Sequence, residues 1–124
     1  LTACYAIYDT HTGQTRVAGT VDEPAGGGAL ASMALGNTSG GMRLALLTGQ
    51  GDRWGCGSKG VCLLIYRFDR GRMSWTRESA RAIGGDGNAG FPGTIVYQDG
   101  AFVAHYRVVN GGRVDLATLL QRVP

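Results

Sequence analysis

The chain has 124 residues, 44% of them hydrophobic and 17% charged, which is typical of a folded globular protein and not of a disordered one. The net charge is only +3, from eleven arginines and one lysine against nine acidic residues, so charge alone does not indicate a nucleic-acid-binding protein. No apolar run is long enough to predict a membrane-spanning helix. The 22 glycines favour tight turns and long loops, and the length favours a single domain over residues 1–124.

The first part of the chain predicts three strands and one short helix. We expect strands over residues 3–8 and 14–21, joined by a turn, and a third over 42–48. Between them, residues 29–35 precede Gly36 and have the composition of two helical turns that end at a glycine.

A hairpin is predicted over residues 61–77. The segment from Val61 to Ile65 is apolar without alternation, which indicates a central strand that is buried on both faces. With Arg70 and Gly71 as the loop, the predicted register places two pairs on one face: Tyr66 opposite Trp75 and Phe68 opposite Met73.

The clearest local signal is the hairpin over residues 94–108. Asp99-Gly100 between two β-rich runs favours a type I′ turn, because both central residues of that turn need a positive φ. This loop places Tyr97 opposite Phe102, on the face that we expect to be buried. The other face is half polar and is predicted to be partly exposed; it carries Thr94, Val96, Val103, His105 and Arg107.

The last segment is predicted to be a short helix near 115–122. Apolar residues there recur at helical spacing, and Asp115 is a suitable N-cap. The complete pattern therefore predicts a mainly β fold: a single antiparallel barrel or sandwich of about seven strands, with one or two short helices.

The three cysteines bear on the compartment. Cys56 and Cys62 bracket a glycine-rich loop and either form a disulfide, which indicates an oxidising compartment, or remain a loop thiol and a core thiol. Residues 1–4, Leu-Thr-Ala-Cys, resemble the lipobox of bacterial lipoproteins, which implies a lipid anchor at Cys4; the other interpretation is a strand with a buried cysteine. The spacing predicts no metal site, and no cofactor motif is present.

Two alternative functions are suggested by particular residue types: a reactive cysteine or histidine for an enzyme, and arginines beside aromatic residues for a nucleic-acid-binding domain. A small enzyme would use Cys56 or His105, with Asp86 or Asp99 orienting the histidine, although no Gly-x-Ser-x-Gly elbow and no phosphate-binding loop is present. An arginine-rich nucleic-acid-binding domain would use Tyr66 and Trp75 as stacking platforms beside five arginines: Arg67, Arg70, Arg72, Arg77 and Arg81. The predicted hairpin register argues against the second alternative, because it places both aromatic rings on a core-like face.

The leading hypothesis is a non-catalytic binding module of a bacterial secreted or envelope protein, or of a cytoplasmic protein if all the thiols are free. Its contact surface would be the glycine-rich loops at 49–60 and 84–93, which are long for a compact domain. Trp54 either anchors a partner or folds back into the core. The candidate residues for binding a protein or small ligand are Arg53, Trp54, Asp86, Asn88, His105 and Arg107. No sequence signal specifies the oligomeric state.

Overall fold

The computed structural model describes residues 3–22, 30–57, 59–85 and 92–124. Within these ranges the chain forms nine strands and one short 3₁₀ helix, η1 (Gly51–Trp54). The strands are β1 (Ala3–Tyr8), β2 (Thr15–Asp22), β3 (Leu30–Thr38), β4 (Gly41–Thr48), β5 (Val61–Asp69), β6 (Ser74–Gly84), β7 (Gly93–Gln98), β8 (Ala101–Asn110) and β9 (Arg113–Arg122).

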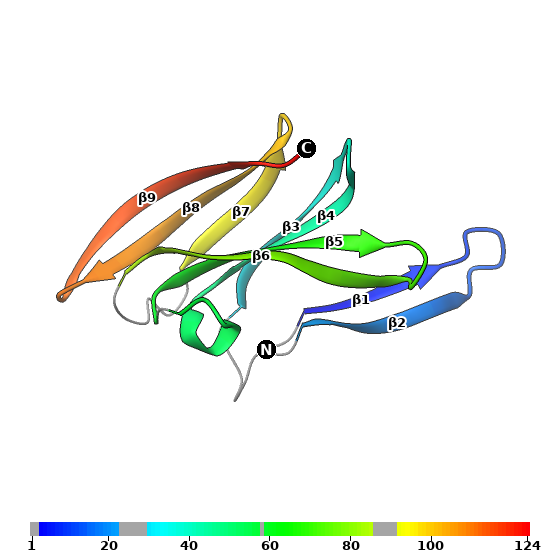
Figure 1. The fold of residues 1–124 in the computed structure, drawn as a ribbon, viewed down its shortest axis with the longest axis horizontal. Helices are drawn as coiled ribbons and strands as arrows, with labels where there is room; N and C mark the ends of the chain where they lie inside the picture. The colour runs from blue at the N-terminus through cyan, green and yellow to red at the C-terminus, as the bar shows by residue number, and fades with distance from the viewer. Residues whose placement is uncertain (1–2, 23–29, 58, 86–91) are drawn as a thin grey trace.

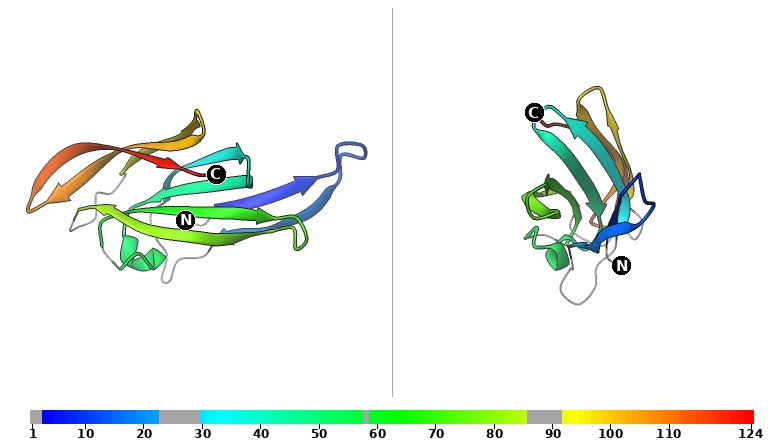
Figure 2. Two further views of the ribbon diagram at one scale, coloured as in Figure 1. Left: turned by 45° about the horizontal axis from the view of Figure 1, so that its top comes forward. Right: turned by 90° about the vertical axis from the view of Figure 1, so that its right-hand side faces the viewer.

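The strands form three antiparallel sheets, with the orders β1-β2, β3-β4-β5-β6 and β7-β8-β9. In Figure 1 the four-stranded sheet lies in the middle, β7–β9 on its left and the β1–β2 hairpin on its right. The left view of Figure 2 shows the hairpin extending away from the other sheets. The predicted mainly antiparallel β fold is confirmed, but there are nine strands instead of about seven, and the sheets do not close into a barrel.

The four-stranded sheet is covered on both faces at its centre. Side chains of β4 and β5 such as Leu47 and Leu63 pack against the inner face of β7–β9, around Phe102. The alternate side chains, such as Leu46 and Leu64, form a second core on the opposite face. This arrangement confirms the prediction that residues 61–65 form a central strand with both faces buried.

The β7–β8 hairpin has the predicted register. Tyr97 pairs with Phe102 and Ile95 with Ala104, on the face that packs into the core. Asp99 and Gly100 both have positive φ, 53° and 78°, as a type I′ turn requires.

The β5–β6 hairpin differs from its predicted register by two residues. Phe68 pairs with Trp75, and the loop has four residues, not two. The Asp69 carboxylate accepts hydrogen bonds from the amides of Gly71 (2.9 Å) and Arg72 (3.1 Å), and this local turn favours the longer loop. Because side chains alternate with a period of two, a shift of two residues leaves Tyr66, Phe68 and Trp75 on their predicted face. Met73, which was predicted to pair with Phe68, instead lies in the loop with a positive φ of 54°.

Both predicted helices are wrong. Residues 30–38 form β3, and the proposed helix near 115–122 is strand β9. Gly111 and Gly112 both have positive φ, and Asn110 pairs with Arg113 across them, so Gly-Gly forms a tight hairpin turn and leads β9 back along β8. Pairing with a neighbouring strand therefore outweighs the weak helical spacing of the leucines.

Cys56 and Cys62 form a disulfide, with their Cα atoms 6.2 Å apart, and this settles the alternative that the sequence left open. Cys4 is a free, exposed cysteine in β1. Its place within a strand agrees with one of the two interpretations, although the side chain is not buried. Within the residues that the structure describes, no helix could span a lipid bilayer.

Arg43 is the one buried charged residue among those described, and it connects three parts of the chain. Its Nε donates to Glu78 Oε1 (2.7 Å), and its Nη1 donates to the Pro124 carbonyl (2.6 Å) and to the Thr38 hydroxyl. The hydrogen bond and charge of Arg43 lower the pKa of the Glu78 carboxyl, although burial opposes this effect.

The first prediction concerns this ion pair. Because the folded-state pKa of Glu78 is lowered, the pair stabilises the fold above the ordinary pKa of 4.5, and this contribution is lost as pH falls through the lowered value. We expect Glu78→Gln to cost about 1 kcal/mol at pH 7. The difference between wild type and variant should shrink in urea unfolding experiments below pH 4.5, and a constant difference from pH 7 to pH 2 would contradict the assignment.

The second prediction concerns the disulfide. Thiol titration of the denatured, unreduced protein should find one free thiol, that of Cys4, and reduction should raise the count to three. Cys56→Ser combined with Cys62→Ala should lower the free energy of unfolding by about 2 kcal/mol, because the closed loop is short. Three thiols before reduction would show that the bridge does not form.

Candidate functional site

An uncharged groove lies beside the β1–β2 hairpin, and we call it the apolar groove. Its volume is about 560 Å³, within the range of ordinary ligand sites. The lining consists of residues 4–7 of β1, Met33 and Leu35 of β3, Met42 and Leu44 of β4, and the aromatic pair Phe68 and Trp75.

The lining residues reveal how the groove is built. From β3 and β4 it takes alternate residues, so the floor is one face of the sheet, where Leu35 pairs with Leu44. From β1 it takes four consecutive residues, whose side chains point to both faces of the hairpin. The groove therefore runs along the edge of β1 instead of over one of its faces.

The hairpin is held obliquely over the four-stranded sheet. The Tyr5 hydroxyl donates to the carbonyl of Met73 (2.9 Å), and the Tyr5 ring meets the Trp75 ring edge-on. On the other side of the hairpin, β2 contacts β6. Consequently β2 lies toward β6, and the free edge of β1 faces β3 and β4.

The floor of the groove is unusually exposed for side chains of its type. Met33 is 50% exposed and Leu35 is 58% exposed, whereas Leu44, the cross-strand neighbour of Leu35, is buried. Scattered exposed leucines are normal in proteins, but exposed apolar side chains gathered on one concave surface are typical of binding sites.

The edge of β1 lacks the usual protection against pairing. Between Cys4 and Ile7 its pairing with β2 is regular, and among the described residues no strand pairs with its other side. Exposed edges normally carry charges or prolines that prevent addition of a strand, as Arg77, Glu78 and Arg81 do on β6. β1, with the sequence Ala-Cys-Tyr-Ala-Ile-Tyr, carries neither.

A second depression lies near the β3–β4 turn, at the end of the four-stranded sheet, and shares Met42 and Phe68 with the apolar groove. It measures about 530 Å³ and is lined by charged residues, including Arg67, Arg70 and Glu78. The carboxylate of Glu78 is engaged by Arg43, as described above, and Asp69 caps its own turn. This depression thus presents two exposed arginines, with both neighbouring carboxylates already occupied.

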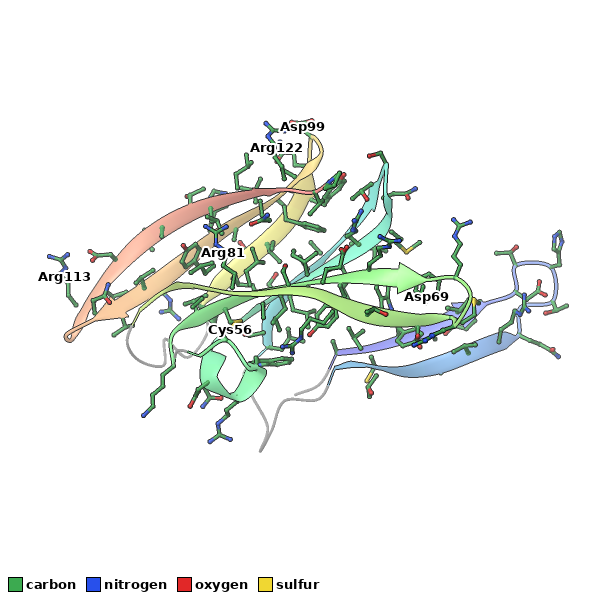
Figure 3. All side chains as sticks on the ribbon, in the orientation of Figure 1. Cys56, Asp69, Arg81, Asp99, Arg113 and Arg122 are labelled. Carbon is green, nitrogen blue, oxygen red and sulfur yellow. A yellow bond between two sulfur atoms is a disulfide. The ribbon has the colours of Figure 1, made fainter. Side chains whose placement is uncertain are left out.

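The glycine-rich loop at 49–60, which the sequence favoured as a contact surface, has a structural role. Trp54 is only 1% exposed, because η1 turns its ring into the core beneath β5, and its carbonyl accepts a hydrogen bond from Arg77 Nη1 (2.8 Å). The disulfide at Cys56, labelled beside η1 in Figure 3, closes this loop. The structure therefore supports the alternative that Trp54 folds back, and Arg53 beside it is exposed.

The other candidate residues are not brought together with this loop. His105 and Arg107 lie on the outer face of β8, where His105 Nδ1 is 3.0 Å from the Thr118 hydroxyl. The proposed pairing of His105 with a Cys56 thiol does not occur, because Cys56 is disulfide-bonded. Asp86 and Asn88 lie outside the described residues, as does most of the loop at 84–93.

The aromatic residues of the nucleic-acid alternative are not arranged as an exposed platform. Tyr66 is buried, with the guanidinium of Arg77 5.9 Å from its ring centre, and Trp75 is half-buried. Arg81 donates to the side chain of Gln121 on the neighbouring sheet. In the described ranges, no group of three or more histidine, cysteine, aspartate or glutamate side chains is placed to hold a metal ion.

Sequence reasoning missed the apolar groove. The signal was present in the uncharged strands at 3–8 and 30–38, but the second of these was assigned to a helix. No local pattern in the sequence predicts that β1 and β3 line the same groove.

The third prediction tests whether the exposed groove residues contribute to folding. Met33→Thr combined with Leu35→Thr should change the free energy of unfolding by less than about 0.5 kcal/mol per residue, because both side chains are half in solvent and threonine suits a strand. The matched control Leu46→Ala, in the same sheet but buried, should cost about 2–5 kcal/mol. Equal losses in urea unfolding would mean that the groove is part of the core.

Comparison of the chain with known protein families finds no match, and comparisons with curated proteins and with solved structures find no similar protein. An argument about function therefore depends on the chemistry of the surfaces described above, since a β architecture by itself does not specify an activity.

Proposed function

We propose that this chain is a non-catalytic binding module that recognises an extended polypeptide segment, which adds to the free edge of β1 as a further strand. The observation that carries the proposal is the coincidence of an unprotected strand edge with an exposed apolar floor. Strand addition uses both features: the edge supplies main-chain hydrogen bonds, and the floor accepts every second side chain.

The orientation of the hairpin supports this occupant. A strand added to β1 on the side away from β2 would lie over Met33 and Leu35, the exposed residues of the floor. Because all lining side chains are uncharged, the preferred segment has apolar residues at alternate positions and no charge facing the floor. A small apolar molecule would use the floor but would gain nothing from the strand edge.

The disulfide supports a setting outside the cytosol, since such bonds persist mainly in oxidising compartments. An exported binding module agrees with this chemistry. The alternative enzyme would have to work without a Cys56 thiol, and His105 has a threonine hydroxyl as its described neighbour.

The fourth prediction tests strand addition directly. From a display library of seven-residue peptides with alternating apolar and threonine positions, we expect binders that wild type retains and that Met33→Asp combined with Leu35→Asp does not. Methylating alternate backbone amides of a selected peptide should abolish binding when the methyl groups lie on the edge that faces β1, and should have little effect on the opposite set. Fluorescence anisotropy of the labelled peptide measures both.

Blocking the groove provides an independent check. Alkylation of the exposed Cys4 thiol with a bulky maleimide should weaken peptide binding, and Cys4→Ser should preserve it and resist the reagent. The proposal is wrong if the library yields no binder, if both methylated sets bind equally, or if only small apolar molecules compete. A dimer that forms by pairing of two β1 edges, detected by analytical ultracentrifugation, would also contradict the proposal, because the added strand would then come from a second copy of the chain.

A further inference from the structure

We propose that the outer face of the β7–β8–β9 sheet is a second interaction surface, for a protein partner whose contact region combines apolar and acidic side chains. We define the outer face by its solvent-directed residues: six apolar (Val96, Val103, Val109, Val114, Leu116, Leu120), three cationic or titratable (His105, Arg107, Arg122) and three neutral polar (Thr94, Gln98, Thr118). In Figure 1 the β7–β9 sheet and the β1–β2 hairpin, beside which the apolar groove lies, are on opposite sides of the four-stranded sheet.

Four of the six apolar residues of the outer face are exposed to solvent: Val96, Val114, Leu116 and Leu120. Leu116 is 86% exposed and Leu120 is 52% exposed, whereas the alternate residues of β9, such as Leu119, pack toward the core. The inner face alone supplies the packing that holds β9, so the exposed leucines are available for another contact.

The register of the strands orders these side chains into rows. Val96, Val103 and Leu120 lie side by side across the three strands, and Val109 pairs with Val114 farther along. Between these apolar rows lie a polar row centred on His105, and the pair Arg107 and Leu116. A shallow depression of about 250 Å³ lies at His105, Arg107 and Leu116. Apolar rows around a polar centre provide both contact area and specificity.

The charge of the outer face specifies the partner. Arg107 and Arg122 are its permanent charges, and no aspartate or glutamate is among its residues. Asp115 of β9 points to the inner side, where Arg113 binds it at 3.0 Å, and Asp99 lies in the β7–β8 turn at the rim (Figure 3). The face is thus cationic, and a complementary surface is acidic.

Charge and shape also argue against two other occupants. Two copies packed face to face would oppose two surfaces whose defined residues include arginines and no carboxylate, so their charges would not be complementary. A membrane surface is usually bound through aromatic side chains and long cationic ones, and the outer face has no tryptophan, tyrosine or phenylalanine. Its β-branched and leucine rows instead suit another protein surface, packed about 10 Å away as sheets pack on one another.

The experiment uses defined polymers on the intact, oxidised chain. We expect a copolymer of glutamate and leucine to bind more tightly than polyglutamate, and vesicles of phosphatidylserine and phosphatidylcholine to show no binding. Leu116→Ser combined with Leu120→Ser should remove the advantage of the copolymer and leave polyglutamate binding unchanged. Arg107→Gln combined with Arg122→Gln should weaken binding of both polymers about fivefold, and less at high salt.

The matched control removes the same number of positive charges from a different part of the surface. Arg16→Gln combined with Arg70→Gln replaces two exposed arginines outside the outer face and should leave both affinities within about twofold of wild type. Circular dichroism confirms that each variant is folded. The inference fails if the control variant weakens binding as much as Arg107→Gln combined with Arg122→Gln does, or if the vesicles bind. It also fails if the chain forms a dimer in solution that Leu116→Ser abolishes. Each outcome is independent of the β1 peptide assay, so the two proposals can fail separately.

Discussion

The rest of the structure depends on the burial of β4 and β5 on both faces. Their apolar runs, from Leu44 to Leu47 and from Val61 to Tyr66, leave no polar face that could remain in water. Two layers must therefore cover them, and the β7–β9 sheet supplies one layer. The β1–β2 hairpin, together with η1, supplies the other. A two-sided strand pair thus requires a three-layered molecule from a chain of only 124 residues.

The same constraint explains where the free surfaces lie. The second layer is a hairpin of two strands, and it does not extend over β3, so Met33 and Leu35 remain exposed beside the edge of β1. The first layer is a single sheet, and its outer face has no further layer among the described elements. Both candidate surfaces are therefore regions that no further layer of the described elements covers, and they lie on opposite sides of the central sheet. The two proposals together would let the chain connect two partners.

The glycine-rich loop at 49–60 contributes to the packing of the core. Its tryptophan completes the second core, its disulfide ties it to the start of β5, and Gly51 donates its amide to the Gly60 carbonyl (3.0 Å). A loop rich in glycine can be a tightly packed closure as readily as a binding surface, because glycine permits close backbone approach in either case. The groove and the outer face lie on strands instead.

The sequence by itself determined the fold class, the central strand at 61–65, the register of the β7–β8 hairpin and the pairing of Cys56 with Cys62 as one of two alternatives. These features depend on neighbouring residues: apolar runs, an Asp-Gly turn and a short cysteine spacing. Tertiary structure alone decided that residues 30–38 and 113–122 are strands, because a partner strand outweighs weak helical spacing. It alone placed β1 beside β3, and it buried Trp54. These outcomes depend on contacts between residues far apart in the chain, whose free energies no local pattern records.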